Sequence, residues 1–167
     1  ISVTGVQTCA LPIFHEREVR GISALTSLPP EWFAYTNLDL ATTTGHSREI
    51  DVIIVAEDRI LVIDLKEWRG PIDSRDGHWF NDNRDHGPSP VGKILSNART
   101  IYTQLETHLR KYTKDKNVVV PKVQGLVVLT TNADFSGVSE TERMAVVPVT
   151  TLVPALKSFH KIGRAHV

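Results

Sequence analysis

The 167-residue sequence contains a single cysteine, Cys9, and no long hydrophobic run. One cysteine excludes an internal disulfide and a zinc site built on several thiolates, and it is typical of a reducing, cytoplasmic setting. Apolar runs such as 118–120 and 126–129 are far shorter than the roughly 20 residues that a membrane-spanning helix needs. We therefore expect a cytoplasmic protein that does not enter a membrane.

The chain also lacks an excess of either charge, with 19 Lys and Arg against 19 Asp and Glu. A balanced chain has no long-range attraction to DNA, RNA or anionic lipid, so any contact with nucleic acid must be local. Hydrophobic residues make up 41% of the sequence, which is enough for one buried core at this length. One globular domain is the expectation.

The two ends of the chain differ from the rest. Residues 1–13 and 161–167 resemble translated sequencing-adaptor read-through of the kind found at the edges of metagenomic open reading frames. We predict that both are non-native artefacts and that the native domain spans residues 14–160. The alternative for residues 1–13 is a short apolar N-terminal strand.

Hydrophobic spacing and turn residues predict the elements of this domain. A helix is expected within 14–28, a long helix from Pro90 to residue 112 with Ser89 as its N-cap, and a closing helix over 151–159. The expected strands are 32–40, 49–55, 60–65, 118–130 and 144–149, and residues 68–90 are expected to be mostly loop with a short strand around 78–80. Helices interleaved with strands predict an α/β fold with a mixed sheet flanked by helices.

The strands 49–55 and 60–65 are separated by four residues, which predicts an antiparallel hairpin. Pairing Val55 with Ile60 brings Asp51 opposite Asp64 and puts Lys66 on the same face, because side chains alternate along a strand. Two carboxylates in this relation repel each other unless a cation neutralises them. Carboxylate oxygens are ligands that Mg²⁺ prefers, and an ammonium beside them can hold water or stabilise a phosphoryl group.

The motif Asp51, then Asp64-Leu65-Lys66 after a hairpin, resembles the PD-(D/E)xK signature of restriction-endonuclease-like enzymes. The longer runs 48–51 and 62–70 resemble the nuclease-related domain (NERD) family, in which the second carboxylate is usually Glu. Residues 16–19, 89–91 and 97–98 resemble that family's acidic first helix, its Asn-Pro helix start and an Asn-Ala pair in the same helix.

The resemblance implies a restriction-endonuclease-like fold and hydrolysis of DNA phosphodiester bonds with Mg²⁺ or Mn²⁺, leaving a 5′-phosphate. Asp51, Asp64 and Glu16 are then the metal ligands, and Lys66 orients and activates water. The family pattern favours Glu16 as the third carboxylate, whereas a helical wheel brings Glu18 nearer the apolar face of the first helix. Where the family often has Gln, this chain has Lys93, which can contact phosphate.

Two other functions remain open on the sequence. The domain can be a non-catalytic nucleic-acid-binding or scaffold module fused to further domains of a larger protein, and Lys93 and the short Asp64 favour this alternative. It can also be a metal-dependent phosphoryl-transfer enzyme that acts on nucleotides. A lone D-x-K triplet is common by chance, so the preference for a nuclease depends on the paired strands and on the opposed Asp51.

Overall fold

The computed structural model describes the backbone of residues 6–8, 16–41, 45–115 and 117–164, and the side chains of residues 19–41, 45–115 and 117–157. The larger of its two sheets is mixed and has the strand order β1-β2-β3-β4-β8-β10. Its strands are β1 (Val6–Thr8), β2 (Phe33–Ala41), β3 (Ser47–Val55), β4 (Arg59–Lys66), β8 (Lys122–Leu129) and β10 (Val146–Pro148). β2, β3 and β4 are antiparallel, and β4, β8 and β10 are parallel.

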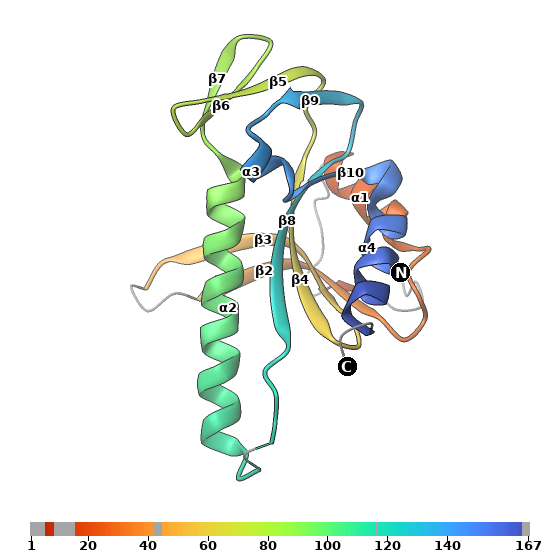
Figure 1. Ribbon diagram of the computed structural model, residues 1–167, viewed down its shortest axis with the longest axis vertical. Helices are drawn as coiled ribbons and strands as arrows, with labels where there is room; N and C mark the ends of the chain where they lie inside the picture. Colours follow the sequence, from red (N-terminus) through yellow and green to blue (C-terminus); the bar gives the residue numbers. More distant parts are fainter. Residues whose placement is uncertain (1–5, 9–15, 42–44, 116, 165–167) are drawn as a thin grey trace.

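Helices cover both faces of this sheet (Figure 1). The long α2 (Pro90–Tyr112) crosses one face, and α1 (Glu16–Leu25) and α4 (Val149–Arg164) lie together on the other. Each face has its own buried cluster, with Ile54 and Leu61 on the α1 and α4 side and Val62 and Ile94 on the α2 side. The predicted α/β class, a mixed sheet flanked by helices, is confirmed.

A second, four-stranded sheet lies beyond one end of α2 (Figure 1). It contains β5 (Gly70–Arg75), β6 (His78–Asn81), β7 (Arg84–Pro88) and β9 (Ala133–Gly137), and the short α3 (Glu140–Arg143) follows it. The prediction that residues 68–90 are mostly loop was therefore wrong. The residues that suggested a loop form two tight hairpin turns, at Asp76-Gly77 and Asp82-Asn83, where all four residues have positive φ.

The other elements follow the predictions with shifted ends. Ser89 caps α2 by accepting a hydrogen bond from the Val91 amide, and Pro90 is the first helical residue, as expected. α1 ends at Leu25, β8 begins only at Lys122, and α4 is longer than the predicted closing helix. Residues Val6–Thr8 form a short strand, as in the alternative prediction for residues 1–13. That both chain ends are non-native stays a prediction.

The position of α2 over the sheet depends on one glycine. An added Cβ at Gly125 of β8 would lie 2.8 Å from the carbonyl oxygen of Ile94, which is closer than real Cβ atoms come to any heavy atom. Glycine thus lets the helix backbone approach the strand directly. This close approach keeps the first turns of α2 next to β3 and β4.

Within the described ranges, none of the helices combines the length and the apolar character that crossing a bilayer requires.

Candidate active site

The β3–β4 hairpin has the predicted register. Val55 pairs with Ile60 and Ile53 with Val62, and the ladder ends at the pair Val52 and Ile63. Asp51 and Asp64 are the next residues along the two strands. The sequence therefore placed these two aspartates correctly at adjacent positions of neighbouring antiparallel strands.

Beyond the last ladder pair, the side chain of Asp51 makes the next contact between the two strands. Its Oδ2 accepts a hydrogen bond of 2.6 Å from the backbone amide of Leu65, the residue between Asp64 and Lys66. Asp51 is only 7% exposed and Asp64 only 8%. Both carboxylates thus lie at the margin of the core, where an unneutralised charge is costly.

Lys66 lies against Asp64. Its Nζ donates to Asp64 Oδ1 over 3.1 Å and lies 2.9 Å from Oδ2. The direction to Oδ2 does not meet the geometry of a hydrogen bond, and this buried oxygen has no hydrogen-bond partner in the described structure. Lys66 therefore offsets the charge of Asp64.

A small, tightly packed crevice with no room for a water molecule lies between the hairpin and α2, and both aspartates line it. It is lined by Glu49, Ile50, Asp51, Ile63, Asp64, Lys93, Ile94 and Asn97. Lys93, which replaces the family's Gln, is exposed and belongs to this lining.

Arg48 fastens the two walls of the crevice. Its Nη1 donates to the Oδ1 of Asn97 and to the Oγ of Ser96, each over 3.1 Å. Asn97 is 1% exposed, so its carbonyl oxygen needs such a donor. The residues Arg48 and Asn97, which carried part of the family resemblance, thus join β3 to α2.

The far end of β4 is anchored by a segment that sequence reasoning did not connect to the site. The carbonyl of Lys66 accepts hydrogen bonds from the amide of Thr130, over 2.9 Å, and from its Oγ1, over 3.3 Å. Thr130 directly follows β8, a strand that is distant from β4 in the sequence but pairs with it in parallel. No local pattern in the sequence gives this contact.

A divalent cation is compatible with the residues present. Asp51 and Asp64 offer the hard oxygen donors that Mg²⁺ and Mn²⁺ prefer, and the buried Asp64 Oδ2 lacks a hydrogen bond. The side chains that the structure describes contain no group of three or more His, Cys, Asp or Glu placed to hold a metal. Glu16 and Glu18 are in α1, and their side chains lie outside the described residues.

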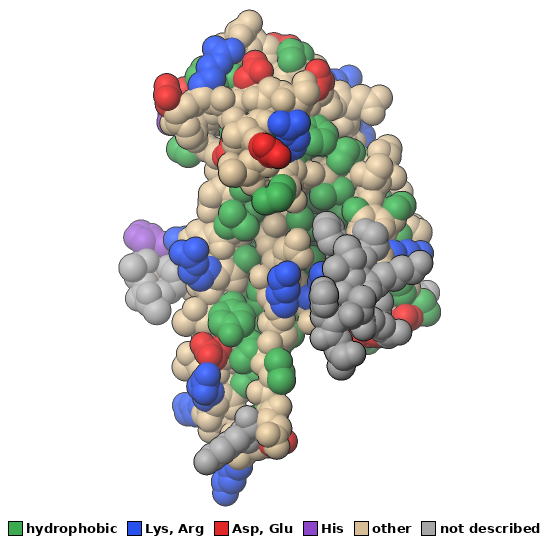
Figure 2. Space-filling model, viewed as in Figure 1, with side chains coloured by type: hydrophobic (Ala, Val, Ile, Leu, Met, Phe, Trp, Pro, Cys, Tyr) green, Lys and Arg blue, Asp and Glu red, His purple; other side chains and the backbone are tan. Residues whose placement is uncertain are grey.

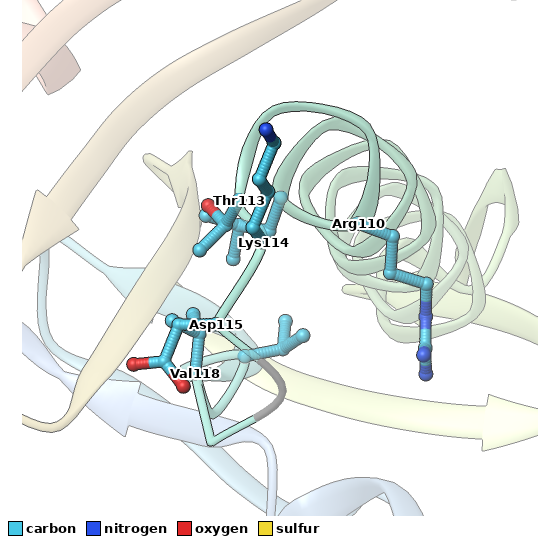
Figure 3. Close-up of a pocket in the computed structure, with 7 residues that line it drawn as sticks. Arg110, Thr113, Lys114, Asp115 and Val118 are labelled. Atoms are coloured by element: carbon cyan, nitrogen blue, oxygen red, sulfur yellow. The ribbon is translucent and has the colours of Figure 1, made fainter.

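Another hollow, of about 330 Å³, lies at the C-terminal end of α2, far along the helix from the aspartates. Figure 3 shows the charged groups of Arg110, Lys114 and Asp115 there pointing away from one another, so they do not converge on one ligand. Arg110 is paired with Glu106 over 2.7 Å. Figure 2 shows Lys and Arg side chains spread over this face of the molecule with Asp and Glu among them. Charge on this face therefore favours no second site.

A mixed sheet between helices, with two carboxylates and a lysine gathered on its central hairpin, is the arrangement of the restriction-endonuclease-like α/β class. Comparison with protein families identifies the branch. The nuclease-related domain (NERD) matches residues 14–130, and the chain belongs to this family.

One curated relative is the "Probable kinase PglW" of Streptomyces coelicolor (strain ATCC BAA-471 / A3(2) / M145). It is 36% identical over 94 residues, which represent 52% of this chain and 6% of that protein. The chain thus spans only a small part of the length of this relative. No solved structure matches the chain significantly.

Proposed function

We propose that this domain is a metal-dependent nuclease that hydrolyses DNA phosphodiester bonds. Asp51 and Asp64 would hold Mg²⁺ or Mn²⁺, with Glu16 as the third ligand, and Lys66 would orient and activate the attacking water. The observation that carries the proposal is the buried Oδ2 of Asp64, which has no hydrogen-bond partner among the described residues, lies 2.9 Å from Lys66 Nζ and belongs to a residue that lines the same crevice as Asp51.

The protein groups have separate tasks in this proposal. When bound, the cation would polarise a phosphoryl oxygen and lower the pKa of water. Lys66 would hold that water or stabilise the negative charge that develops on the phosphate. The hydrogen bond from the Leu65 amide to Asp51 fixes the backbone between Asp64 and Lys66, and Thr130 fixes the backbone after it. With the backbone on both sides of Lys66 fixed, the side chains of Asp64 and Lys66 would not have to reorganise far during the reaction.

Cleavage of linear and plasmid DNA with Mg²⁺ or Mn²⁺ tests this proposal. We expect Asp64→Ala and Lys66→Ala to abolish cleavage while the circular dichroism spectrum stays that of the wild type. Asp76→Asn and Lys122→Ala are matched controls, because both side chains are exposed and neither lines the crevice. Unchanged cleavage in both site variants would refute the assignment. Turnover of mononucleotides in place of DNA would identify a nucleotide-directed phosphoryl-transfer enzyme.

A second function is a non-catalytic nucleic-acid-binding or scaffold module within a larger protein. The match to only 6% of a much longer relative is consistent with a place in a larger protein but does not bear on catalysis. A protein with this function would bind DNA with the same affinity whether or not Asp64 is present, and no metal would promote cleavage. The assay above therefore separates the two functions.

A further inference from the structure

A polar hollow lies where β4 and β8 end, just past Lys66. Its volume is about 380 Å³, and it is lined by Arg20, Arg69, Thr130, Thr131 and Asn132. It is separate from the crevice between the hairpin and α2, with which it shares no lining residue. Two arginines in one hollow favour an anion as its occupant.

The backbone that carries Arg69 is fixed by successive hydrogen bonds to its carbonyl groups. Thr130 donates to the carbonyl of Lys66, and the hydroxyl of Thr131 donates to that of Trp68. The side-chain amide of Asn81 donates to the carbonyl of Arg69 over 2.6 Å and to that of Pro71 over 3.0 Å. The segment from Lys66 to Pro71 is therefore held in one shape, and Arg69 has a defined place beside the hollow.

The turn after Arg69 requires glycine. Gly70 has a φ of +72°, and a Cβ added there would lie 2.9 Å from the Oδ1 of Asp82. The positive φ disfavours any other residue there, whereas the Asp82 side chain could move to admit a Cβ. The Trp68-Arg69-Gly70 run, which was part of the family resemblance, thus leads from β4 into β5 with Arg69 exposed.

The two arginines differ in how much of their charge is offset. Arg20 is paired with Glu67 over 2.6 Å. Arg69 is exposed, and among the described side chains its guanidinium has no hydrogen bond or ion pair. The hollow therefore has a net positive charge, with guanidinium, amide and hydroxyl groups in its lining. Guanidinium groups match the geometry of phosphate oxygens.

The distance from the candidate active site suits nucleic acid. Arg69 is three positions after Lys66 in the chain, and an extended chain spans at most about 3.3 to 3.6 Å per residue, or roughly 10 Å between their Cα atoms. One strand of duplex DNA rises about 3.4 Å per nucleotide. A phosphate within about three nucleotides of the one at Lys66 can reach the hollow.

We propose that the hollow formed by Arg20, Arg69 and the loop 130–132 is a phosphate-binding subsite for the nucleic-acid strand that enters the active site. The subsite rests on the proposed nuclease function, and its ligand is either an internal backbone phosphate or a terminal 5′-phosphate. Arg69 is its main contact because its charge is not offset by a neighbour.

Binding without catalysis tests the subsite separately from the chemistry. Fluorescence anisotropy of a labelled duplex is measured in EDTA with the wild type, Arg69→Ala and Arg84→Ala. Arg84 is the matched control because it is also exposed but does not line the hollow. Arg69→Ala should weaken binding roughly five- to tenfold at 0.1 M salt and make the slope of log K against log salt shallower by about 0.9. Arg84→Ala should leave both values unchanged.

Replacing Glu67 gives a change of opposite sign. Glu67→Gln removes the carboxylate that competes with phosphate for Arg20, so binding should become tighter. If the ion pair had a purely structural role, Glu67→Gln would weaken binding of the duplex or leave its affinity unchanged. Circular dichroism of each variant confirms the fold.

Two forms of the DNA distinguish the source of the phosphate. If the Arg69→Ala effect disappears with a 5′-hydroxyl duplex, the ligand is the terminal phosphate. If it persists there and on circular DNA, the ligand is an internal phosphate. Equal affinities of Arg69→Ala and Arg84→Ala, or no binding by the wild type, overturn the subsite. Loss of binding in Arg69→Ala without any metal-dependent cleavage by the wild type retains the subsite and rejects the nuclease.

Discussion

At the scale of single residues, the site brings two buried carboxylates together on adjacent strands and fixes the backbone around them with hydrogen bonds. Asp51 and Asp64 are each less than a tenth exposed; Asp64 lies 2.9 Å from Lys66 Nζ, and Asp51 accepts a hydrogen bond from the Leu65 amide. Like charges on adjacent strands destabilise a sheet, and burial adds a desolvation cost. The protein tolerates both costs at the place where its family resemblance is strongest. A divalent cation, if bound as proposed, would offset both costs.

Lys66 should contribute to the reaction and not to metal binding. Lys66→Met removes the ammonium that competes with a cation for Asp64, so the affinity for Mn²⁺ should be unchanged or higher. The cleavage rate should fall about 10²- to 10³-fold, as when one charge-stabilising donor is lost. Calorimetric titration and a single-turnover cleavage assay on the same preparation measure the two quantities. A parallel loss of metal affinity would show that Lys66 supports the metal site itself.

The sequence predicted the central residues of the site because they are set by strand pairing. A short hairpin fixes its register, and alternation then brings Asp51, Asp64 and Lys66 together without knowledge of the remaining fold. Thr130 and Asn81, which hold the backbone around Lys66 and Arg69, could not be predicted in this way. They reach the site through a parallel pairing and a second sheet that only the folded chain reveals.

At the scale of elements, α2 and β8 determine the shape of the crevice. α2 provides one wall through Lys93, Ile94 and Asn97, and Gly125 of β8 sets its distance from the sheet. The long helix was predictable from its cap and periodicity. Its close approach to β8 was not predictable, because the sequence does not show which element packs against Gly125.

Gly125→Ala should destabilise the protein. Its Cβ would meet backbone atoms of Ile94 that cannot move without shifting α2. Overpacking of this kind costs about 1 to 3 kcal/mol, which lowers the melting temperature by roughly 2 to 10 °C in a domain of this length. Gly92→Ala is the control, since a Cβ there meets nothing within 4 Å. We expect the control to be neutral or up to about 1 kcal/mol more stable. Equal melting temperatures would show that α2 adapts freely.

The second sheet should weaken in acid through Glu142 of α3. Burial alone would raise the pKa of this carboxyl, but hydrogen bonds from Ser89, Trp79, Ser139 and Ser74 outweigh burial and hold the pKa below its usual value. Because the pKa of this carboxyl is lower in the folded than in the unfolded state, the carboxylate stabilises the folded protein at pH values above its unfolded-state pKa. That stability is lost as the pH falls through the folded value.

Urea unfolding of Glu142→Gln tests this linkage. The variant should be about 1 kcal/mol less stable than the wild type at neutral pH, and the difference should shrink as the medium is acidified. Glu140→Gln, in the same helix and exposed, should show neither effect. A difference that does not change with pH would mean that the Glu142 carboxylate is not responsible.

The elements of the second sheet mark the limit of prediction from sequence. Residues 68–90 contain the Gly, Asp and Asn that usually indicate loops, and here they form the positive-φ turns of β-hairpins. The short strands between those turns lack a clear apolar alternation. Trp79, which is fully buried, anchors the sheet to the core only through contacts with distant residues.

At the scale of the whole molecule, charge balance limits how DNA can be held. The chain has equal numbers of acidic and basic residues, and several arginines are already paired, among them Arg20, Arg59 and Arg110. Under the proposed function, attraction to DNA would therefore come from a few local contacts.

Salt dependence should reveal this small number of contacts. The slope of log K against log salt for binding to duplex DNA is about −0.9 for each phosphate neutralised. We expect a slope shallower than about −4 for the wild type, measured by anisotropy in EDTA over a range of salt concentrations. A slope near about −10 would mean an extensive basic surface that the charge distribution does not predict.

The central claim is that Asp51 and Asp64, from neighbouring strands, share one divalent cation. Calorimetric titration of Mn²⁺ into the wild type, Asp51→Asn, Asp64→Asn and the double variant tests it directly. We predict one site in the wild type, a loss of affinity of more than about tenfold in each single variant, and no further loss in the double variant. Equal affinity in all four proteins would contradict the account.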